Sequence, residues 1–120
     1  MSQNSQFLVS LLKSGSRAYA AYASGELLDS RPDAKEAFGG DPFSAWQGWL
    51  SGRVEELAAA VAAEDAGLFK AQVQWAKALL EARNIAPEHF RTGLACLGSV
   101  LAKELPEQVR PLAKHYLDEA

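Results

Sequence analysis

Apolar residues recur at steps of three and four positions along nearly the whole chain, and this spacing decides what the chain can fold into. Near the amino terminus it is followed by Leu8, Leu11, Gly15, Ala18 and Tyr22. Such spacing places side chains on one face of an α-helix, whereas a half-buried strand requires strict alternation. The sequence therefore predicts an all-α fold in which the stripe beginning at Leu8 faces the core.

Prolines and helix-capping residues divide this pattern into segments. Asp41 and Asp65 are expected to cap helices, and Pro42 suits the first helical position. Asn84 is expected to end a helix. The expected helices span 4–28, 42–63, 66–83, 87–104 and 107–119, with a single helical turn at 34–38 and a start of the last helix that Pro111 can delay. The short links predict an antiparallel bundle of four to five helices.

The length of the chain predicts a single helical-bundle domain over residues 1–120. A chain of 120 residues buries about two thirds of the surface that its unfolded form exposes, which suffices for one core. Hydrophobic residues make up 48% and charged residues 22%, as in ordinary globular proteins. Neither a flexible linker nor an internal repeat interrupts the sequence.

The net charge and the hydropathy of the chain indicate which partners and which cellular compartment to expect. The net charge of −3 disfavours nucleic-acid binding, which depends on a basic surface. The polar amino terminus and the absence of a long apolar run disfavour a signal peptide or a membrane span. The single cysteine, Cys96, allows no internal disulfide. A cytoplasmic protein is expected, with neither nucleic acid nor membrane as its partner.

No catalytic or metal-binding constellation is recognisable. A nucleophilic hydrolase needs an activated serine or cysteine, and Cys96 lies in an apolar helix where a packed core thiol is expected. His89 and His115 fall on different predicted helices, without zinc-ligand spacing. Adjacent carboxylates such as Glu55 and Glu56 do not face each other on a helix. We therefore predict a protein that is not an enzyme and that holds no metal.

The helix predicted after Pro42 carries two further expectations. Gly48 and Gly52 lie one helical turn apart, and each costs about 1 kcal/mol of helix stability relative to alanine. A close approach of another helix would compensate this cost. Arg53 lies beside the apolar position Val54 and is assigned to the polar surface of the same helix.

The aromatic residues are the strongest functional signal, because three tryptophans, together with Phe43 and Phe69, are a large aromatic load for so small a domain. The candidate interaction or pocket residues are Phe43, Trp46, Trp49, Phe69, Trp75 and Tyr116. Trp46 and Trp49 are three positions apart and cannot both point squarely into one core. Two interpretations stay open: a bundle core with a boundary indole, or a hydrophobic interface or ligand pocket. We expect Trp49 and Trp75 at the surface, with Phe43 and Trp46 nearer the core.

Several of these segments resemble a known family. They are Phe43-x-x-Trp46, residues 53–58, Leu68-Phe69, residues 73–83, Leu97-x-x-Val100-Leu101-x-x-Glu104-Leu105-Pro106 and residues 116–120. Together they look like the amino-terminal helical region of some bacterial cobalamin-binding regulatory proteins. In that family a separate domain carries Asp-x-His-x-x-Gly, which is absent here. The resemblance therefore implies a regulatory or protein-interaction module, without implying cobalamin binding.

Two functional hypotheses follow from the sequence. The preferred one is a non-catalytic regulatory or sensory module that acts by self-association or by packing against a partner domain, and it needs no cofactor. The alternative is a small-molecule sensor that encloses a hydrophobic cofactor such as a tetrapyrrole between its helices, with His89 or His115 as the ligand. A stand-alone enzyme is the least favoured class.

Overall fold

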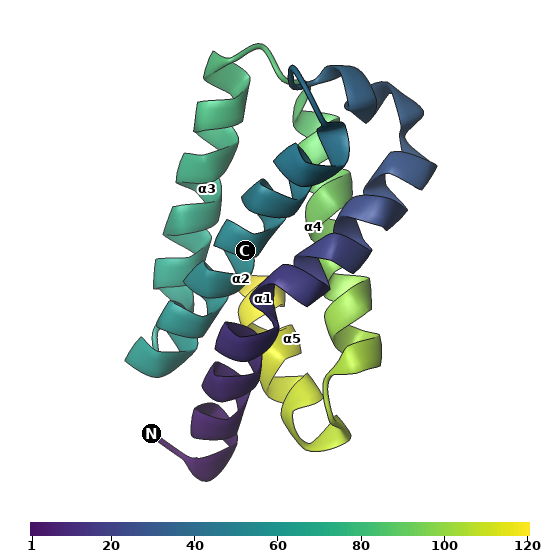
Figure 1. Ribbon diagram of the computed structural model, residues 1–120. Coiled ribbons are helices and arrows are strands. Elements are labelled where there is room, and N and C mark those ends of the chain that lie inside the picture. The colour runs from purple at the N-terminus through teal and green to yellow at the C-terminus, as the bar shows by residue number, and fades with distance from the viewer.

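A computed structural model describes residues 1–120 as five α-helices and two short 3₁₀ turns, with no strand (Figure 1). The helices are α1 (Gln3–Ser30), α2 (Pro42–Ala63), α3 (Ala66–Ala82), α4 (Pro87–Glu104) and α5 (Arg110–Glu119), and the 3₁₀ turns are η1 (Pro32–Glu36) and η2 (Glu107–Val109). The prediction of an all-α helical bundle is confirmed. None of the helices combines the length and the hydropathy that crossing a bilayer requires.

The helix ends follow the predicted capping chemistry. The Asp41 side chain accepts a hydrogen bond from the backbone N–H of Phe43, and the Asp65 side chain accepts one from that of Leu68. Asn84 takes up the left-handed conformation at φ 61°, two residues after the end of α3. The last helix begins only at Arg110, with Pro111 in its first turn, because residues 107–109 form the 3₁₀ turn η2.

The longest helix, α1, packs most extensively against α2 and also contacts α4. Its buried face differs from the prediction: Tyr22 is 58% exposed and Ala18 is exposed, whereas the buried positions include Leu12, Ser16 and Ala20. Small residues on this face leave room for α2, and a tyrosine turned inward would not fit there. The predicted stripe therefore holds at Leu8 and in part at Leu11, which is half-buried against the core, and is wrong at Ala18 and Tyr22.

The remaining helices surround the α1–α2 pair. Figure 1 shows α3 along the outer edge of the bundle, beside α2, and shows α4 and α5 meeting at η2 and diverging from there. The α3 helix packs against α2, α5 and α4, and α5 also contacts α4. The buried apolar side chains form one continuous cluster, in which Trp46, Phe69 and Phe90 are the largest fully buried members.

The glycines of α2 do not serve the close helix contact that was predicted. A Cβ atom added at Gly48 or Gly52 would meet no atom within 4 Å, so no other helix of this chain approaches them. The close approach lies instead at Gly93 of α4, where an added Cβ would be 3.3 Å from Cδ2 of Leu50. The prediction was wrong because spacing along one helix does not reveal which face its neighbour covers.

Candidate functional site

The predicted aromatic residues are divided between the core and the surface. Trp46, Phe69 and Tyr116 are buried, and Trp49 is half-buried. Trp75 is 64% exposed, as expected. Phe43 was expected nearer the core but is 39% exposed, because it lies in the first turn of α2, where the facing position on α1 is Gly25. The six residues therefore form no single site.

Trp75 lies on a second apolar face of α3. The core side of this helix is formed by Phe69, Val73, Ala76 and Leu80, all of them buried. The opposite side, here called the α3 outer face, consists of Leu68, Ala71, Trp75, Ala78 and Ala82. Leu68 is half-buried and the other four residues are exposed. A helix at the edge of the bundle is thus apolar on both sides, although only one side is covered by this chain.

The α3 outer face has the spacing of a coiled-coil seam. Its five residues are separated by alternating steps of three and four, the repeat that keeps apolar side chains facing a partner helix. The flanking positions are Gln72, Gln74, Leu79 and Glu81, so only one of the four carries a charge. Little electrostatic repulsion would therefore oppose the approach of another helix along this seam.

Trp49 forms a second surface feature together with two arginines. The guanidinium carbon of Arg53 is 5.3 Å from the centre of the indole ring, and that of Arg83 is 5.9 Å away. Arg53 was assigned to the polar surface but is only 7% exposed, and its Nε donates to Oε1 of Glu56. The indole and Glu56 together shield this cation, a partnership that the helical pattern did not reveal.

The two histidines occupy unlike environments. His89 is buried at the start of α4, where Nδ1 accepts a 3.2 Å hydrogen bond from Nε of Arg31 and Nε2 lies 3.8 Å from Oδ2 of Asp33. Its ring packs edge-to-face on Trp46. His115 is exposed on α5, next to Tyr116. No group of three or more His, Cys, Asp or Glu side chains is placed to hold a metal ion.

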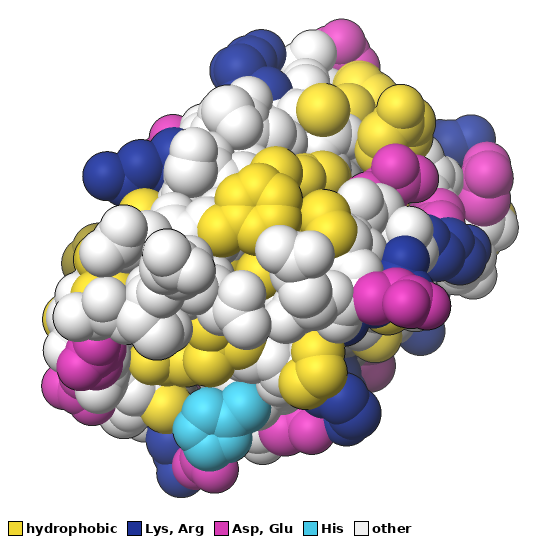
Figure 2. Space-filling model, turned by 90° about the horizontal axis from the view of Figure 1, so that it is seen from below, with side chains coloured by type: hydrophobic (Ala, Val, Ile, Leu, Met, Phe, Trp, Pro, Cys, Tyr) yellow, Lys and Arg dark blue, Asp and Glu magenta, His cyan; other side chains and the backbone are white.

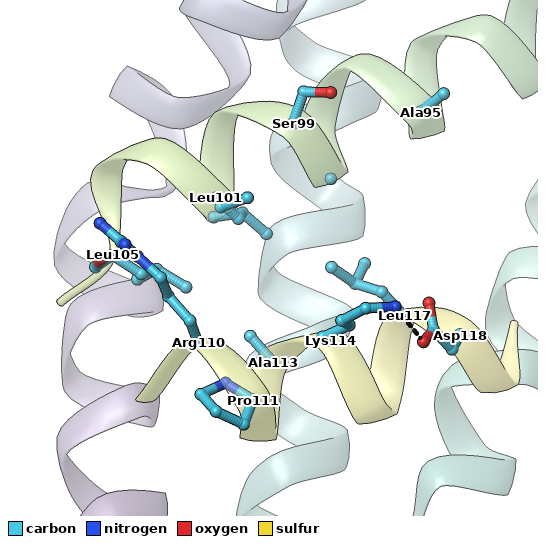
Figure 3. A pocket seen from close by; sticks show the side chains of 12 residues that line it. Ala95, Ser99, Leu101, Leu105, Arg110, Pro111, Ala113, Lys114, Leu117 and Asp118 are labelled. Atoms are coloured by element: carbon cyan, nitrogen blue, oxygen red, sulfur yellow. Dashed lines mark hydrogen bonds and ion pairs between the residues drawn. The ribbon is translucent and has the colours of Figure 1, made fainter. Parts of the chain in front are cut away.

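A groove of about 570 Å³ lies between α4 and α5. It is lined by Ala95, Gly98, Ser99, Leu101, Ala102 and Leu105 from α4 and its end, and by Arg110, Pro111, Ala113, Lys114, Leu117 and Asp118 from α5. Figure 3 shows Leu101 and Ala113 pointing into the space between the two helices, and Lys114 bonded to Asp118 at its edge. Neither histidine and none of the six predicted aromatic residues lines this groove.

Burial raises the pKa of two titratable groups, one on α5 and one on α4. Burial raises the pKa of the Tyr116 hydroxyl, and the carboxylates of Glu64 and Asp65 raise it further. Burial also raises the pKa of the Cys96 thiol, with a smaller contribution from Glu26. Cys96 is half-buried rather than fully packed in the core. A raised pKa lowers the thiolate fraction, and the thiolate is the nucleophilic form.

The molecule carries charges of both signs between its apolar patches. Figure 2 views the structure from below and shows hydrophobic side chains interrupted by acidic and basic groups.

Comparison of the chain with protein-family models, with curated proteins and with solved structures finds no match. The resemblance to the helical region of cobalamin-binding regulatory proteins therefore stays a prediction.

Proposed function

We propose that this chain is a non-catalytic regulatory module that works by protein–protein interaction, and that it self-associates through the α3 outer face. The observation that carries the proposal is the exposed seam centred on Trp75. Tryptophan is enriched among the residues that dominate binding energy, and a truncated hot-spot residue costs about 2 kcal/mol or more. Covering this indole with a partner would remove an apolar surface from water.

The seam is suited to a second copy of the same chain. In a two-fold interface the same patch lies on both sides, so residue i contacts residue j and residue j contacts residue i. With two α3 helices antiparallel, Trp75 of each copy can face Ala78 of the other, and the large ring fills the space that the small side chain leaves. Both members of this complementary pair are exposed on one helix face.

The charges beside the seam also favour a second copy of this chain as the partner. Positions that flank a coiled-coil seam set partner choice, and like charges there oppose pairing. Gln72, Gln74 and Leu79 are uncharged, and Glu81 is the single acidic residue among the four. A copy of this face therefore meets a nearly neutral surface. A heterologous partner domain is the competing occupant, and the measurement below separates the two.

Sedimentation equilibrium across a concentration series tests the proposal. The wild-type chain is expected to dimerise. Ala78→Glu is expected to raise the dissociation constant of the dimer at least about 30-fold, because it places a carboxylate in the seam. Ala78 is exposed in the monomer, so the variant leaves the core unchanged.

Tyr22→Glu is the matched control for this experiment. Tyr22 is an exposed aromatic residue on α1, outside the proposed seam, and its replacement also adds one carboxylate. This variant is expected to dimerise like the wild type. A wild-type chain that stays monomeric at high concentration, or an Ala78→Glu variant that dimerises normally, would exclude self-association through α3.

A further inference from the structure

We infer that the groove between α4 and α5 binds a single-chain amphipathic carboxylate, a free fatty-acid anion, whose alkyl chain lies on the apolar floor and whose carboxylate lies beside Arg110. This ligand site is separate from the α3 outer face, because the two share no residue. Its failure would leave the proposed self-association untouched.

The size and lining of the groove fit a small apolar molecule. Its volume of about 570 Å³ lies within the usual range of about 300–1,000 Å³ for small-molecule sites. The exposed Ala102 and Pro111 and the half-buried Leu117 supply the apolar surface, and Leu101 and Leu105, each 1% exposed, close the floor beneath it. Gly98 and Ala102 are small, so one wall of the groove is low. A Cβ atom added at Gly98 would meet no atom within 4 Å, so this wall is open to a ligand.

The charges along α5 give the groove a direction. Arg110 and Lys114 are one helical turn apart and both line it, whereas Asp118 lies one turn further along. Nζ of Lys114 is paired with Oδ2 of Asp118 at 2.6 Å, so Arg110 is the one cation lining the groove that has no carboxylate partner. The end near η2 is therefore positive, and the far end carries a paired lysine and aspartate. A ligand with one anionic head and an apolar tail matches this arrangement, with its head beside Arg110.

Arg110 is held in place for such a contact. Its Nε donates a 2.6 Å hydrogen bond to the carbonyl of Leu105, and its Nη2 donates a 3.3 Å bond to the carbonyl of Lys103. These bonds fix the guanidinium at the carboxyl end of α4 and leave other N–H groups free. A fixed guanidinium with free donors binds a carboxylate at little further cost in side-chain entropy.

The polar content of the groove favours an alkyl chain over an extended peptide. A peptide on this floor would bring backbone N–H and C=O groups that need partners, and an unpaired buried group costs about 1–3 kcal/mol. Along the floor only Ser99 offers a neutral polar side chain. Methylene groups need no partner there.

Calorimetric titration of the full chain with sodium decanoate, below its micelle concentration, tests the inference. Saturable binding is expected, at least about tenfold tighter than that of decyltrimethylammonium, which has the same tail and the opposite charge. Lys114→Gln is expected to weaken decanoate binding about threefold, because it removes a cation and leaves the carboxylate of Asp118 without its partner at the edge of the groove.

Gly98→Leu places a side chain in the groove and is expected to abolish decanoate binding. Gly48→Leu is the matched control, because its added Cβ on α2 also meets no atom within 4 Å. Both changes favour helix formation, so circular dichroism is expected to show folded variants. The control should bind decanoate like the wild type.

Three results would overturn the inference: absence of saturable decanoate binding, equal affinity for the two amphiphiles, or normal binding by Gly98→Leu. The Trp75→Glu variant separates the groove from the α3 outer face. It should bind decanoate normally, and loss of binding there would instead assign the ligand to the face around Trp75.

Discussion

The indole Nε1 of Trp46 donates a 3.0 Å hydrogen bond to the backbone carbonyl of Ala34, in the 3₁₀ turn that connects α1 to α2. Both residues are fully buried. Phe38, from the same connection, packs edge-to-face on the indole with ring centres 4.9 Å apart. One side chain of α2 thus holds the connection against the core and sets where α2 begins relative to α1.

Trp46→Phe should lower the free energy of unfolding by about 2–4 kcal/mol, because it removes a buried hydrogen bond and leaves a cavity. Urea denaturation followed by far-ultraviolet circular dichroism measures the change. Phe7→Leu is the control, since Phe7 is 38% exposed, and it should shift stability by less than about 0.5 kcal/mol. Equal effects of the two substitutions would contradict the anchoring role of Trp46.

The ion pair of Arg53 and Glu56 should respond asymmetrically to substitution. Glu56→Gln removes the carboxylate partner of a cation that is only 7% exposed, and it should cost about 2 kcal/mol of stability. Arg53→Met keeps the packing against Trp49 and removes the charge that needs a partner. It should therefore be within about 1 kcal/mol of the wild type.

Urea denaturation of the two single variants decides this second prediction. If Arg53→Met destabilised the protein more than Glu56→Gln, the guanidinium would contribute more by its contacts with Glu56 and Trp49 than its burial costs. The cost of burying the charge would then not govern this pair.

Helical spacing and capping residues predicted the elements well, because both signals are local. Asp41, Pro42 and Asp65 fixed the starts of two helices to the residue. The buried face of α1 could not be predicted in the same way. Its stripe through Tyr22 and the observed stripe through Ser16 and Ala20 are both consistent with helical geometry, and only the approach of α2 decides between them.

The candidate sites depended more strongly on tertiary structure. Trp75 was predicted at the surface, and it lies there because Phe69, Val73 and Leu80 form the core side of its helix. The groove was not predicted. Its lining combines small residues of α4 with Arg110 and Lys114 of α5, and nothing in the spacing of either helix indicates how far apart the two lie.

Alanine should stabilise the protein at an open glycine position and not at a closely packed one. Gly52→Ala should stabilise the protein by about 0.5–1 kcal/mol, since the added Cβ meets no atom within 4 Å and alanine favours the helix. Gly93→Ala should lose this gain, because its Cβ would press on Leu50 at 3.3 Å in a packed core. Thermal unfolding at fixed protein concentration compares them, and equal stabilisation by both would contradict the close packing at Gly93.

Tyr116 should make stability fall at alkaline pH. Burial and the carboxylates of Glu64 and Asp65 raise the pKa of its hydroxyl above the ordinary 10.0. The unfolded chain therefore ionises first, and the stabilisation is present below pH 10 and lost as the pH rises through the higher pKa of the folded state. Tyr116→Phe removes the titrating hydroxyl, so its unfolding free energy should decline less between pH 9 and pH 11 than that of the wild type. Urea denaturation at these two pH values measures both declines, and identical declines would show that another group governs the alkaline loss.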